Sequence, residues 1–547
     1  MRNVALQIDP RDNVMVALRD LSPGKRVEFA GGSCELTSGI PSKQKFVTED
    51  LASGDAIRMY GVLVGRAKGP IRKGERLTHA NIQPDAAPYD GTSPGYRWSP
   101  PDISRWANRT FSGYRRVDGQ VGTRNYWLVV PLVFCENRNI SVLQQAFEEE
   151  LGYAAPQPYR HQIADLARLH RDGKTPEADA LAASGTADAP ASNRLFAHLD
   201  GIRFLVHQGG CGGTREDSYN LCGLIAGYVN HPNVAGATVL SLGCQHAQIG
   251  VLREQLHKRH PKFDKPLIIL EQQRSGSEFA MLSEAVRRTF LGLAEADKAR
   301  REPAALSHLC LGLKCGGSDG FSGISANPSI GHTADLVVAL GGKAVLSEFP
   351  ELCGVEQELI NRSSRKEVSD RFVGLVRDYQ TRARALSFAR DASAGSSRDG
   401  FLTEAMHSAA ALKKAGTSPV TAVLDYPEYS TQPGLNLQCT PCEDAESVTA
   451  QVGAGANIVL FTTGLGTAVG NPIAPVVKLS SNSELARSMP EMIDIDAGQV
   501  ITGETTVEGM GEAILERVIR IASGEAVTKA EINGQNDFVP WKRGVSL

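Results

Sequence analysis

The stretch LCLGLKCGGSDG, residues 309–320, has the form of a buried strand followed by a glycine-rich loop. Its first half is a short apolar run, which is typical of a strand covered on both faces of a parallel sheet. Its second half places Cys315, Ser318 and Asp319 directly after that strand. Because ligands of α/β proteins gather beyond the carboxyl ends of strands, the stretch predicts an α/β fold and the edge at which a site lies.

Three further apolar runs end in the same way. LVVPLVF is followed by Cys135, IRFLV by His207 and the glycine-rich Cys211 loop, and GATVLSLG by Cys244. Helical patterns such as SVLQQAFEEELGY and YNLCGLIAGYVN lie between these runs. Strands that alternate with helices indicate a mainly parallel sheet, so we predict α/β architecture for most of the chain.

The organisation of the chain follows from its length and its turn signals. A chain of 547 residues suggests about three domains. Residues 1–85 contain short strand patterns between turns and form a predicted small β-rich domain. Residues 86–110 are rich in Pro, Gly and Ser and are a predicted linker. Residues 111–300 and 301–547 are two predicted α/β domains, with loops or weak structure expected at 172–192 and 391–400.

Composition excludes several classes of protein. The net charge is −3 and no basic stripe is present, so a nucleic-acid partner is not expected. No long apolar run suggests a signal peptide or a membrane span, which favours a cytoplasmic protein. The ten cysteines are expected to be reduced thiols, some of which bind metal. No nucleophile elbow, phosphate-binding Walker loop, HExxH pair or EF-hand loop is present, so no hydrolase or kinase is evident.

The cysteines after the strands are candidate metal ligands, although their spacing is not that of a zinc finger. Thiolate and imidazole ligands suit iron or zinc. His207 either shares a site with Cys211 or is a hydrogen-bonded histidine at a strand end. The run FTTGLGTAVGNP, residues 461–472, has glycine spacing one residue too long for a dinucleotide fingerprint. Its loop either receives an anionic substrate on backbone N–H groups or is a plain tight turn.

Taken together, several long runs resemble the altronate/galactarate dehydratase family, with altronate dehydratase the nearer subfamily. The first 85 residues are similar to the SAF-type module that precedes the catalytic part in this family. The runs that carry the resemblance include HQGGCGGTREDS (207–218), LKCGGSDGFSGISANP (313–328), SEFPELCGVEQ (347–357), VLFTTGLGTAVGNPIAPVVKLSSNSELA (459–486) and IDIDAGQVITGE (493–504).

The resemblance implies dehydration of a sugar acid, D-altronate in the nearer subfamily, to a 2-keto-3-deoxy acid. It also implies an activating divalent metal, usually Fe²⁺, with Mn²⁺ as another choice. A base removes the proton beside the carboxylate, a cation stabilises the resulting enediolate, and an acid protonates the departing hydroxyl. The candidate residues are His207, Asp319, Glu348 and Glu504 for catalysis; Arg124, Ser318, Asn327, His79, Gly464 and Gly466 for substrate binding; and Cys211, Cys244 and Cys315 for metal.

The chain departs from the family pattern at four places. Lys43 stands in a segment that usually reads Gly-His-Lys, Thr78 precedes His79 where a His pair is usual, Lys314 replaces a common Glu, and 391–400 replaces an Asn-Pro-rich loop. Three functions therefore stay open: a metal-dependent dehydratase, a lyase on another 2-hydroxy acid such as galactarate or sulfolactate, and a non-catalytic sugar-acid-binding paralogue. The roles of base and acid, and assembly into a homo-oligomer, also stay open.

Overall fold

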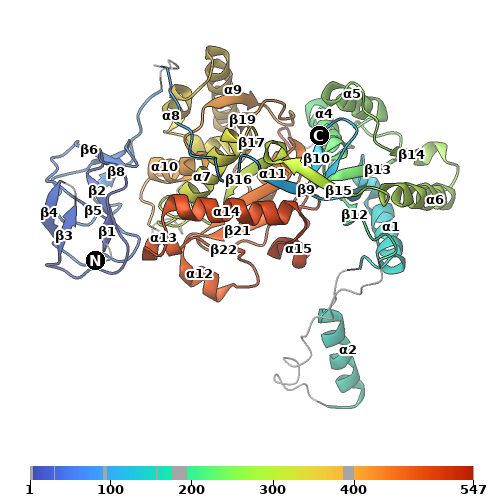
Figure 1. Cartoon of the computed structure of the whole chain (residues 1–547), viewed down its shortest axis with the longest axis horizontal. Coiled ribbons are helices and arrows are strands. Elements are labelled where there is room, and N and C mark those ends of the chain that lie inside the picture. Colours follow the sequence, from blue (N-terminus) through green and yellow to red (C-terminus); the bar gives the residue numbers. More distant parts are fainter. Residues whose placement is uncertain are drawn as a thin grey trace.

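The computed structural model describes residues 4–29, 31–89, 91, 95–154, 158–174, 194–385 and 400–545. Figure 1 shows a small β-rich domain in blue at one end of the molecule, a large α/β domain in the centre and a second α/β domain at the other end. The predicted loops at 172–192 and 391–400 lie almost entirely outside the described residues. No helix in the described ranges is long and apolar enough to span a bilayer.

The N-terminal domain consists of short antiparallel strands, as the sequence predicts. Its core contains Met15, Phe46 and Val27, which are at most 2% exposed. The strands are β1 (Ala5–Leu6), β2 (Val14–Ala17) and β5 (Lys45–Val47) in one sheet, the hairpin β3 (Arg26–Phe29) and β4 (Gly32–Glu35), and β6 (Ala56–Met59), β7 (Val62–Ala67) and β8 (Ile82–Gln83) in a third group.

The described part of the segment that follows this domain has no strand before residue 110 and runs against the C-terminal domain. The Tyr96 hydroxyl donates to the Thr417 carbonyl, and the buried Trp106 indole donates to Glu516. A three-stranded antiparallel sheet, in the order β10-β9-β15, then joins the two α/β domains. Its strands are β9 (Thr110–Arg115), β10 (Val121–Gly122) and β15 (Arg301–Ala305).

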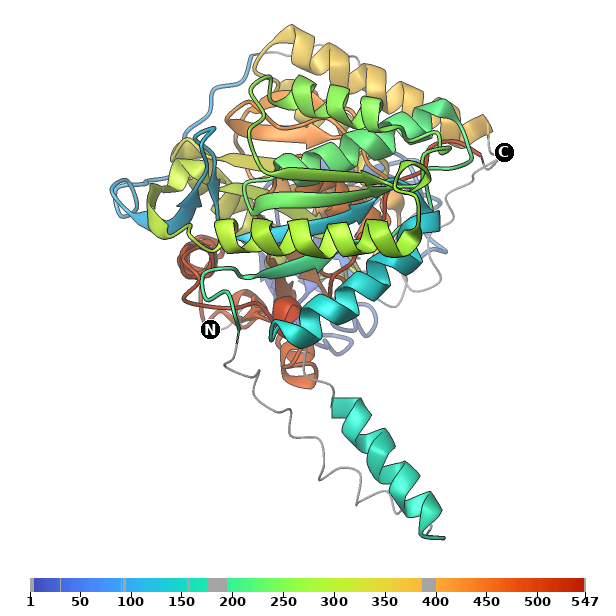
Figure 2. The same cartoon turned by 90° about the vertical axis from the view of Figure 1, so that its right-hand side faces the viewer.

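The second domain has a parallel four-stranded sheet in the order β12-β11-β13-β14. Alternate side chains of β11 face opposite cores, Leu128 toward α4 and Trp127 toward α1 and α6, which is the period-two pattern of a strand covered on both faces. In Figures 1 and 2, α2 projects away from the body of the molecule. The elements are β11 (Tyr126–Pro131), β12 (Gly201–Phe204), β13 (Val234–Ser241), β14 (Leu267–Glu271), the helical turns η1 (Phe134–Glu136) and η2 (Gln272–Arg274), α1 (Asn137–Glu150), α2 (Pro158–Arg171), α4 (Arg215–Asn230), α5 (Ile249–Arg259) and α6 (Glu278–Ala296).

The C-terminal domain has a parallel seven-stranded sheet in the order β18-β19-β17-β16-β20-β21-β22. The chain begins at the central strand β16, forms β17, β18 and β19 on one side of it, and returns to begin the other half at β20. The crevice between β16 and β20 is therefore the topological switch point, where ligands of such sheets bind. The strands are β16 (Cys310–Cys315), β17 (Lys343–Leu346), β18 (Val420–Leu424), β19 (Gly434–Gln438), β20 (Ile458–Thr463), β21 (Val476–Ser480) and β22 (Ile495–Asp496).

Helices cover this sheet and connect its strands. They are η3 (Leu306–His308), α7 (Ala326–Ala339), η4 (Phe349–Leu352), α8 (Glu356–Asn361), α9 (Lys366–Ala385), α10 (Glu404–Leu412), η5 (Lys413–Ala415), α11 (Asp444–Gly453), α12 (Ser483–Ser488), α13 (Gln499–Thr502), α14 (Val507–Ala522) and α15 (Lys529–Ile532).

The two α/β domains pack through α4 and α11. The helices approach so closely that a Cβ on Gly227 would lie 2.2 Å from the Gly453 carbonyl oxygen, and the Tyr228 hydroxyl donates to the Thr449 carbonyl.

Candidate functional site

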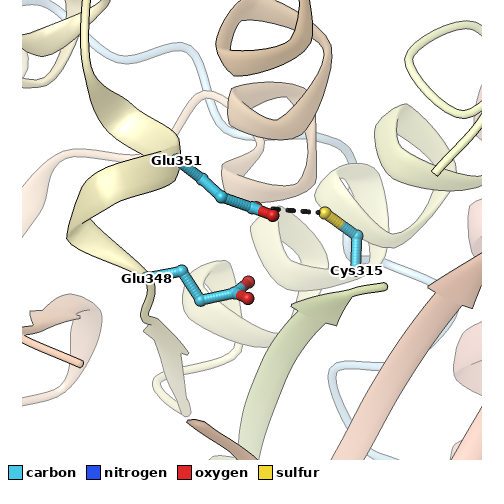
Figure 3. Close-up of side chains that lie close together, drawn as sticks. All are labelled: Cys315, Glu348 and Glu351. Carbon is cyan, nitrogen blue, oxygen red and sulfur yellow. Dashed lines mark hydrogen bonds between the residues drawn. The ribbon is translucent and has the colours of Figure 1, made fainter. Parts of the chain in front are cut away.

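A buried cluster of charged side chains and one thiol lies at the carboxyl edge of the seven-stranded sheet. Lys314 and Cys315 end β16, Glu348 follows β17, Glu351 lies on η4, and Lys414 lies on η5. All five are buried. Figure 3 shows that Cys315, Glu348 and Glu351 point toward one another from three different elements. The strand order therefore assembles groups that are up to 100 residues apart in the chain.

The ammonium group of Lys414 occupies the centre of this cluster. Its Nζ atom lies 2.9 Å from the Cys315 Sγ, 2.9 Å from Glu348 Oε2 and 3.0 Å from Glu351 Oε2. The Cys315 Sγ in turn donates to Glu351 Oε2 at 3.3 Å. Lys414 is therefore bound by all three side chains drawn in Figure 3.

A second ammonium group, from Lys314, closes the other side of Glu348. It contacts Glu348 Oε1 directly and lies 2.7 Å from Asp444 Oδ1. Asp444 is the most open member of the cluster, with 26% of its side chain exposed. Two cations thus face three carboxylates, which balances most of the charge that burial would otherwise make costly.

Burial and mutual attraction set the protonation states. Burial raises the pKa of the Cys315 thiol to about 12, helped by the negative charge of Glu351, so the thiol keeps its proton. Burial also acts to raise the pKa of Glu351, but Lys414 and the other nearby cations hold that pKa well below its usual value. Against the effect of burial, the thiol and both glutamates raise the pKa of Lys414. The cluster contains a stable Lys414–Glu351 ion pair.

Glu348 differs from its neighbours in backbone and in charge. Its φ of 72° lies in the left-handed region, which costs a non-glycine residue about 1–3 kcal/mol and is common at functional sites. The hydroxyl of Thr440 accepts its backbone N–H at 3.0 Å and helps hold this conformation. Burial, and then repulsion by Glu351, raise the pKa of Glu348, while both lysines oppose the shift. Glu348 is thus the carboxyl group best suited to exchange a proton.

Cys315, Glu348 and Glu351 are a candidate site for a divalent metal ion. Among the residues that the structure describes, they are the group of three such side chains whose ligand atoms all lie within 4.8 Å of one another. Thiolate and carboxylate donors suit iron or zinc. However, Lys414 already lies within 3.0 Å of a donor atom of each residue. The arrangement does not fit a metal ion at its centre, because an ammonium ion takes that place.

Asp319, a predicted catalytic residue, lies in the loop after the same strand and is completely buried. Its carboxylate accepts hydrogen bonds from Ser481 Oγ at 2.6 Å and Asn482 Nδ2 at 3.1 Å, and Lys43 Nζ lies 2.8 Å from Oδ2. Lys43 belongs to the N-terminal domain and has a left-handed φ of 71°. That domain therefore places a cation at the edge of the C-terminal sheet.

The predicted substrate loop lies beside Asp319, but the backbone N–H groups of Gly464 and Gly466 already donate hydrogen bonds within the protein. A Cβ on Gly464 would lie 2.4 Å from the Asp319 Cγ, so this position requires glycine. The N–H of Gly464 donates to the Gly317 carbonyl, and the N–H of Gly466 donates to Thr463 Oγ1. The tight-turn interpretation explains these bonds. Ser318, half-buried between Gly317 and Asp319, is the side chain in this region that remains a predicted substrate contact.

Three predicted site residues are engaged in hydrogen bonds or ion pairs within the fold. His207 Nε2 bonds the Pro131 carbonyl at 2.8 Å and Nδ1 accepts the Gly209 N–H at 3.1 Å, so both ring nitrogens are occupied. Arg124 is buried in an ion pair with Glu531 and donates to backbone carbonyls. Asn327 donates to the Ala410 carbonyl and accepts from Thr462. Both ring nitrogens of His207 are therefore already hydrogen-bonded in this structure. The bonds of Arg124 and Asn327 connect neighbouring elements of the fold.

Glu504 and His79 lie apart from the buried cluster. Both are exposed; Glu504 accepts a hydrogen bond from the neighbouring Thr502 hydroxyl. Lys43, by contrast, extends from the N-terminal domain to the edge of the C-terminal sheet. The sequence identified Lys43 only as a departure from the family pattern.

The three predicted metal-binding cysteines fall into two groups. Cys315 lies in the buried cluster with Glu348 and Glu351. Cys211 and Cys244 lie at the edge of the other sheet, near Cys135, whose pKa is raised by burial and then by the charge of either of these thiols. Sequence reasoning missed Glu351 and Lys414 as site residues, and it noted Cys135 among the strand-end cysteines without including it in the predicted metal set. Glu351 follows Glu348 by three residues in a matched run, and Cys135 ends a predicted strand, but nothing in the sequence marks Lys414.

Comparison with known families covers almost the whole chain. Residues 3–85 match the altronate/galactarate dehydratase SAF domain. Residues 113–297 match the second domain of D-galactarate dehydratase/altronate hydrolase. Residues 306–546 match the C-terminal domain of D-galactarate/altronate dehydratase. The three matched regions correspond to the β-rich domain and the two parallel sheets.

Individual relatives give the same result. The chain is 32% identical to an altronate dehydratase of Bacillus subtilis (strain 168) and 32% identical to one of Escherichia coli (strain K12), with 99% of each chain covered in both comparisons. It is 26% identical to the galactarate dehydratase (L-threo-forming) of Escherichia coli (strain K12), over 96% of this chain and 93% of the relative. The chain therefore belongs to the altronate/galactarate dehydratase family.

Proposed function

We propose that this protein is a hydro-lyase that removes water from a sugar acid, with D-altronate as the substrate and a 2-keto-3-deoxy acid as the product. The observation that carries the proposal is the match to two altronate dehydratases over 99% of both chains. The structure supports it, since ionisable groups are concentrated at the carboxyl edge of the larger sheet, the edge at which ligands of this architecture bind.

The cluster contains groups suited to each demand of the reaction. The proton beside a carboxylate is weakly acidic, so its removal requires a base and positive charge near the developing enediolate. Lys314 and Lys414 supply positive charge in a buried setting, where it acts strongly. Glu348, with its raised pKa, is the proposed proton-transfer group. Ser318 and Asp319, in the adjoining loop, are the proposed contacts to substrate hydroxyls.

We propose Fe²⁺ as the activating metal, with Mn²⁺ as the alternative, because thiols are the chain's characteristic strand-end groups and soft donors suit iron. When bound, such a metal supplies Lewis acidity toward the substrate carboxylate or hydroxyl. We also propose that the reaction takes place in the cytoplasm.

The decisive experiment is an assay of 2-keto acid formation over a panel of aldonates, aldarates and sulfolactate. The full chain is purified without oxygen and supplied with Fe²⁺ before the assay. Turnover of altronate supports the proposal. Turnover of galactarate or sulfolactate alone identifies a lyase on another 2-hydroxy acid, and saturable binding of sugar acids without turnover identifies a non-catalytic paralogue.

A further inference from the structure

Three cysteines meet at the switch point of the smaller sheet, away from the cluster proposed for catalysis. Cys135 follows the central strand β11, and Cys211 and Cys244 follow its two neighbours β12 and β13. Since these strands are parallel and adjacent, their carboxyl ends share one edge. The chain passes from β11 to β12 on one side and then crosses to β13 on the other side of β11, so this edge is also a topological switch point, where ligands of such sheets bind.

Backbone hydrogen bonds tie the three cysteine loops together. The N–H of Phe134 donates to the Gly209 carbonyl at 3.0 Å, and the N–H of Ala247 donates to the Gly210 carbonyl at 3.0 Å. Gly210 has a φ of +100°, and a Cβ there would lie 2.1 Å from the Leu132 carbonyl oxygen. The Cys211 loop therefore crosses directly over the end of β11, and the positions of the three thiols are coupled.

His207 connects two of the segments that form this edge. One ring nitrogen holds the end of β11 through the Pro131 carbonyl, and the other holds the Cys211 loop through the Gly209 N–H. Burial lowers the pKa of His207 to about 4, so the ring is neutral and keeps both bonds at physiological pH. On the Cys244 side, Gln245 accepts the Gly243 N–H at 2.6 Å and donates to Ser241 Oγ at 2.6 Å. Such supporting bonds are typical of preorganised metal sites.

The three thiols are available to a ligand, unlike Cys315. Cys135 and Cys244 are exposed and Cys211 is half-buried. In the part of the chain that the structure describes, none of the three is hydrogen-bonded to another residue, whereas Cys315 is bound by Lys414 and Glu351. Three neighbouring thiols on rigid loops form a soft, anionic ligand set once they ionise.

The distances between the three Sγ atoms favour a cluster of several irons over a single metal ion. One metal ion, with sulfur ligands at about 2.3 Å, needs its donor atoms close together. The three Sγ atoms do not all lie within 4.8 Å of one another, the limit that the Cys315 group meets. An iron–sulfur cluster has several irons, and each thiolate binds a different one.

We propose that Cys135, Cys211 and Cys244 hold a [4Fe–4S] cluster by three of its four irons, at the carboxyl edge of the second domain's sheet. The thiols lose three protons on binding, and the fourth iron keeps a position for an oxygen ligand. This inference concerns metal binding alone and does not depend on the reaction proposed above.

The test measures iron, acid-labile sulfide and visible absorption of the full chain, purified without oxygen and reconstituted with sulfide and equal amounts of Fe²⁺ and Fe³⁺, which together supply the oxidation level of a [4Fe–4S]²⁺ cluster. We expect about four irons and four sulfides per chain, with the broad charge-transfer absorption of a cluster. Cys135→Ser, Cys211→Ser and Cys244→Ser are each expected to lose at least half of the iron and sulfide. Neither substrate nor turnover enters the measurement, so its outcome is separate from that of the keto-acid assay.

Cys315→Ser is the matched control, because it changes a cysteine that also follows a parallel strand but lies in the glutamate–lysine cluster. It is expected to keep iron and sulfide at the level of the unchanged chain. Circular dichroism and the melting temperature of each metal-free variant establish that it folds, and a variant that does not fold is replaced by the corresponding Cys→Ala. Iron without sulfide, no iron, or loss of iron in the Cys315→Ser variant but not in the other three would each overturn the proposal.

Discussion

At the scale of single residues, the main finding is that lysines provide the positive charge of the buried cluster. Lys314 and Lys414 lie among Glu348, Glu351 and Asp444 with almost no exposure to solvent. A buried ion pair contributes little net stability compared with apolar side chains, but removal of one partner is costly because a charge is left unpaired. The identity of residue 314 should therefore control both the stability of the site and its affinity for metal.

Lys314→Glu is expected to convert the cluster into a metal-binding site. The change removes one cation and adds a carboxylate beside Glu348 and Asp444, so the metal-free protein should lose about 3–5 kcal/mol of stability. Divalent metal should restore much of this loss, because it binds the folded state alone. Unfolding is measured with and without Fe²⁺ or Mn²⁺. Lys366→Glu, on the exposed face of α9, is the control, and equal metal responses in the two variants would contradict the prediction.

His207 should make stability depend on mildly acidic pH. Its pKa is lowered from 6.5 to about 4 by burial, so the unfolded chain takes up a proton at a pH where the folded chain does not. Stability is therefore full above pH about 6.5 and falls as pH drops toward 4, by about 3 kcal/mol from this residue.

His207→Gln should flatten that part of the pH profile. Denaturant unfolding at several pH values measures it, and His79→Gln, at an exposed histidine, should leave the profile unchanged. An unchanged slope in the His207 variant would show that the ring titrates normally in the folded protein.

At the scale of elements, the loops after the strands approach one another so closely at two glycines that a Cβ atom would clash. The loop after β20 packs on the Asp319 loop through Gly464, and the loop after β12 crosses β11 through Gly210. In each case the strand order brings two loops within van der Waals contact at a switch point. The sites therefore depend on loop–loop packing as much as on the residues that carry the chemistry.

Gly464→Ala is expected to damage the site more than the fold. Its methyl group would meet the Asp319 side chain at 2.4 Å, which forces the Asp319 loop outward and should cost about 1–3 kcal/mol. We expect at least a tenfold loss of kcat/KM for the proposed dehydration, while the secondary structure is retained. Gly250→Ala, on α5 with open space around it, should keep full activity and stability. Similar activity in the two variants would mean that the loop contact is unimportant.

At the scale of the whole molecule, the N-terminal domain takes part in the architecture of the C-terminal edge. Lys43 pairs with Asp319, Lys45 bonds the Gly400 carbonyl, and Thr403 donates to the Val64 carbonyl. Burial lowers the pKa of Lys45 to about 7. These contacts attach the small domain both to the loop that carries Asp319 and to the segment that leads into α10.

Lys43→Met is expected to lower catalysis without unfolding either domain. Asp319 would lose its ion-pair partner but keep the hydrogen bonds from Ser481 and Asn482, so its loop should become less well positioned. We expect kcat for the proposed reaction to fall at least tenfold, with a small change in melting temperature. Lys25→Met, at an exposed position of the same domain, is the control. Unchanged kinetics of the Lys43 variant would remove the N-terminal domain from the site.

The amino-acid sequence by itself determined the β-rich first domain, the α/β class of the rest and the family, because apolar periodicity and long motif runs are local properties. It also located Cys315 and Asp319 directly after a strand, and the family resemblance singled out Glu348. Only the tertiary structure decided which strand ends are neighbours. That order placed Lys414 among the glutamates, brought Lys43 across from another domain, occupied both nitrogens of His207, and separated Cys315 from Cys135, Cys211 and Cys244. The physical reason is that adjacency in a parallel sheet results from packing over the whole domain, which no local pattern encodes.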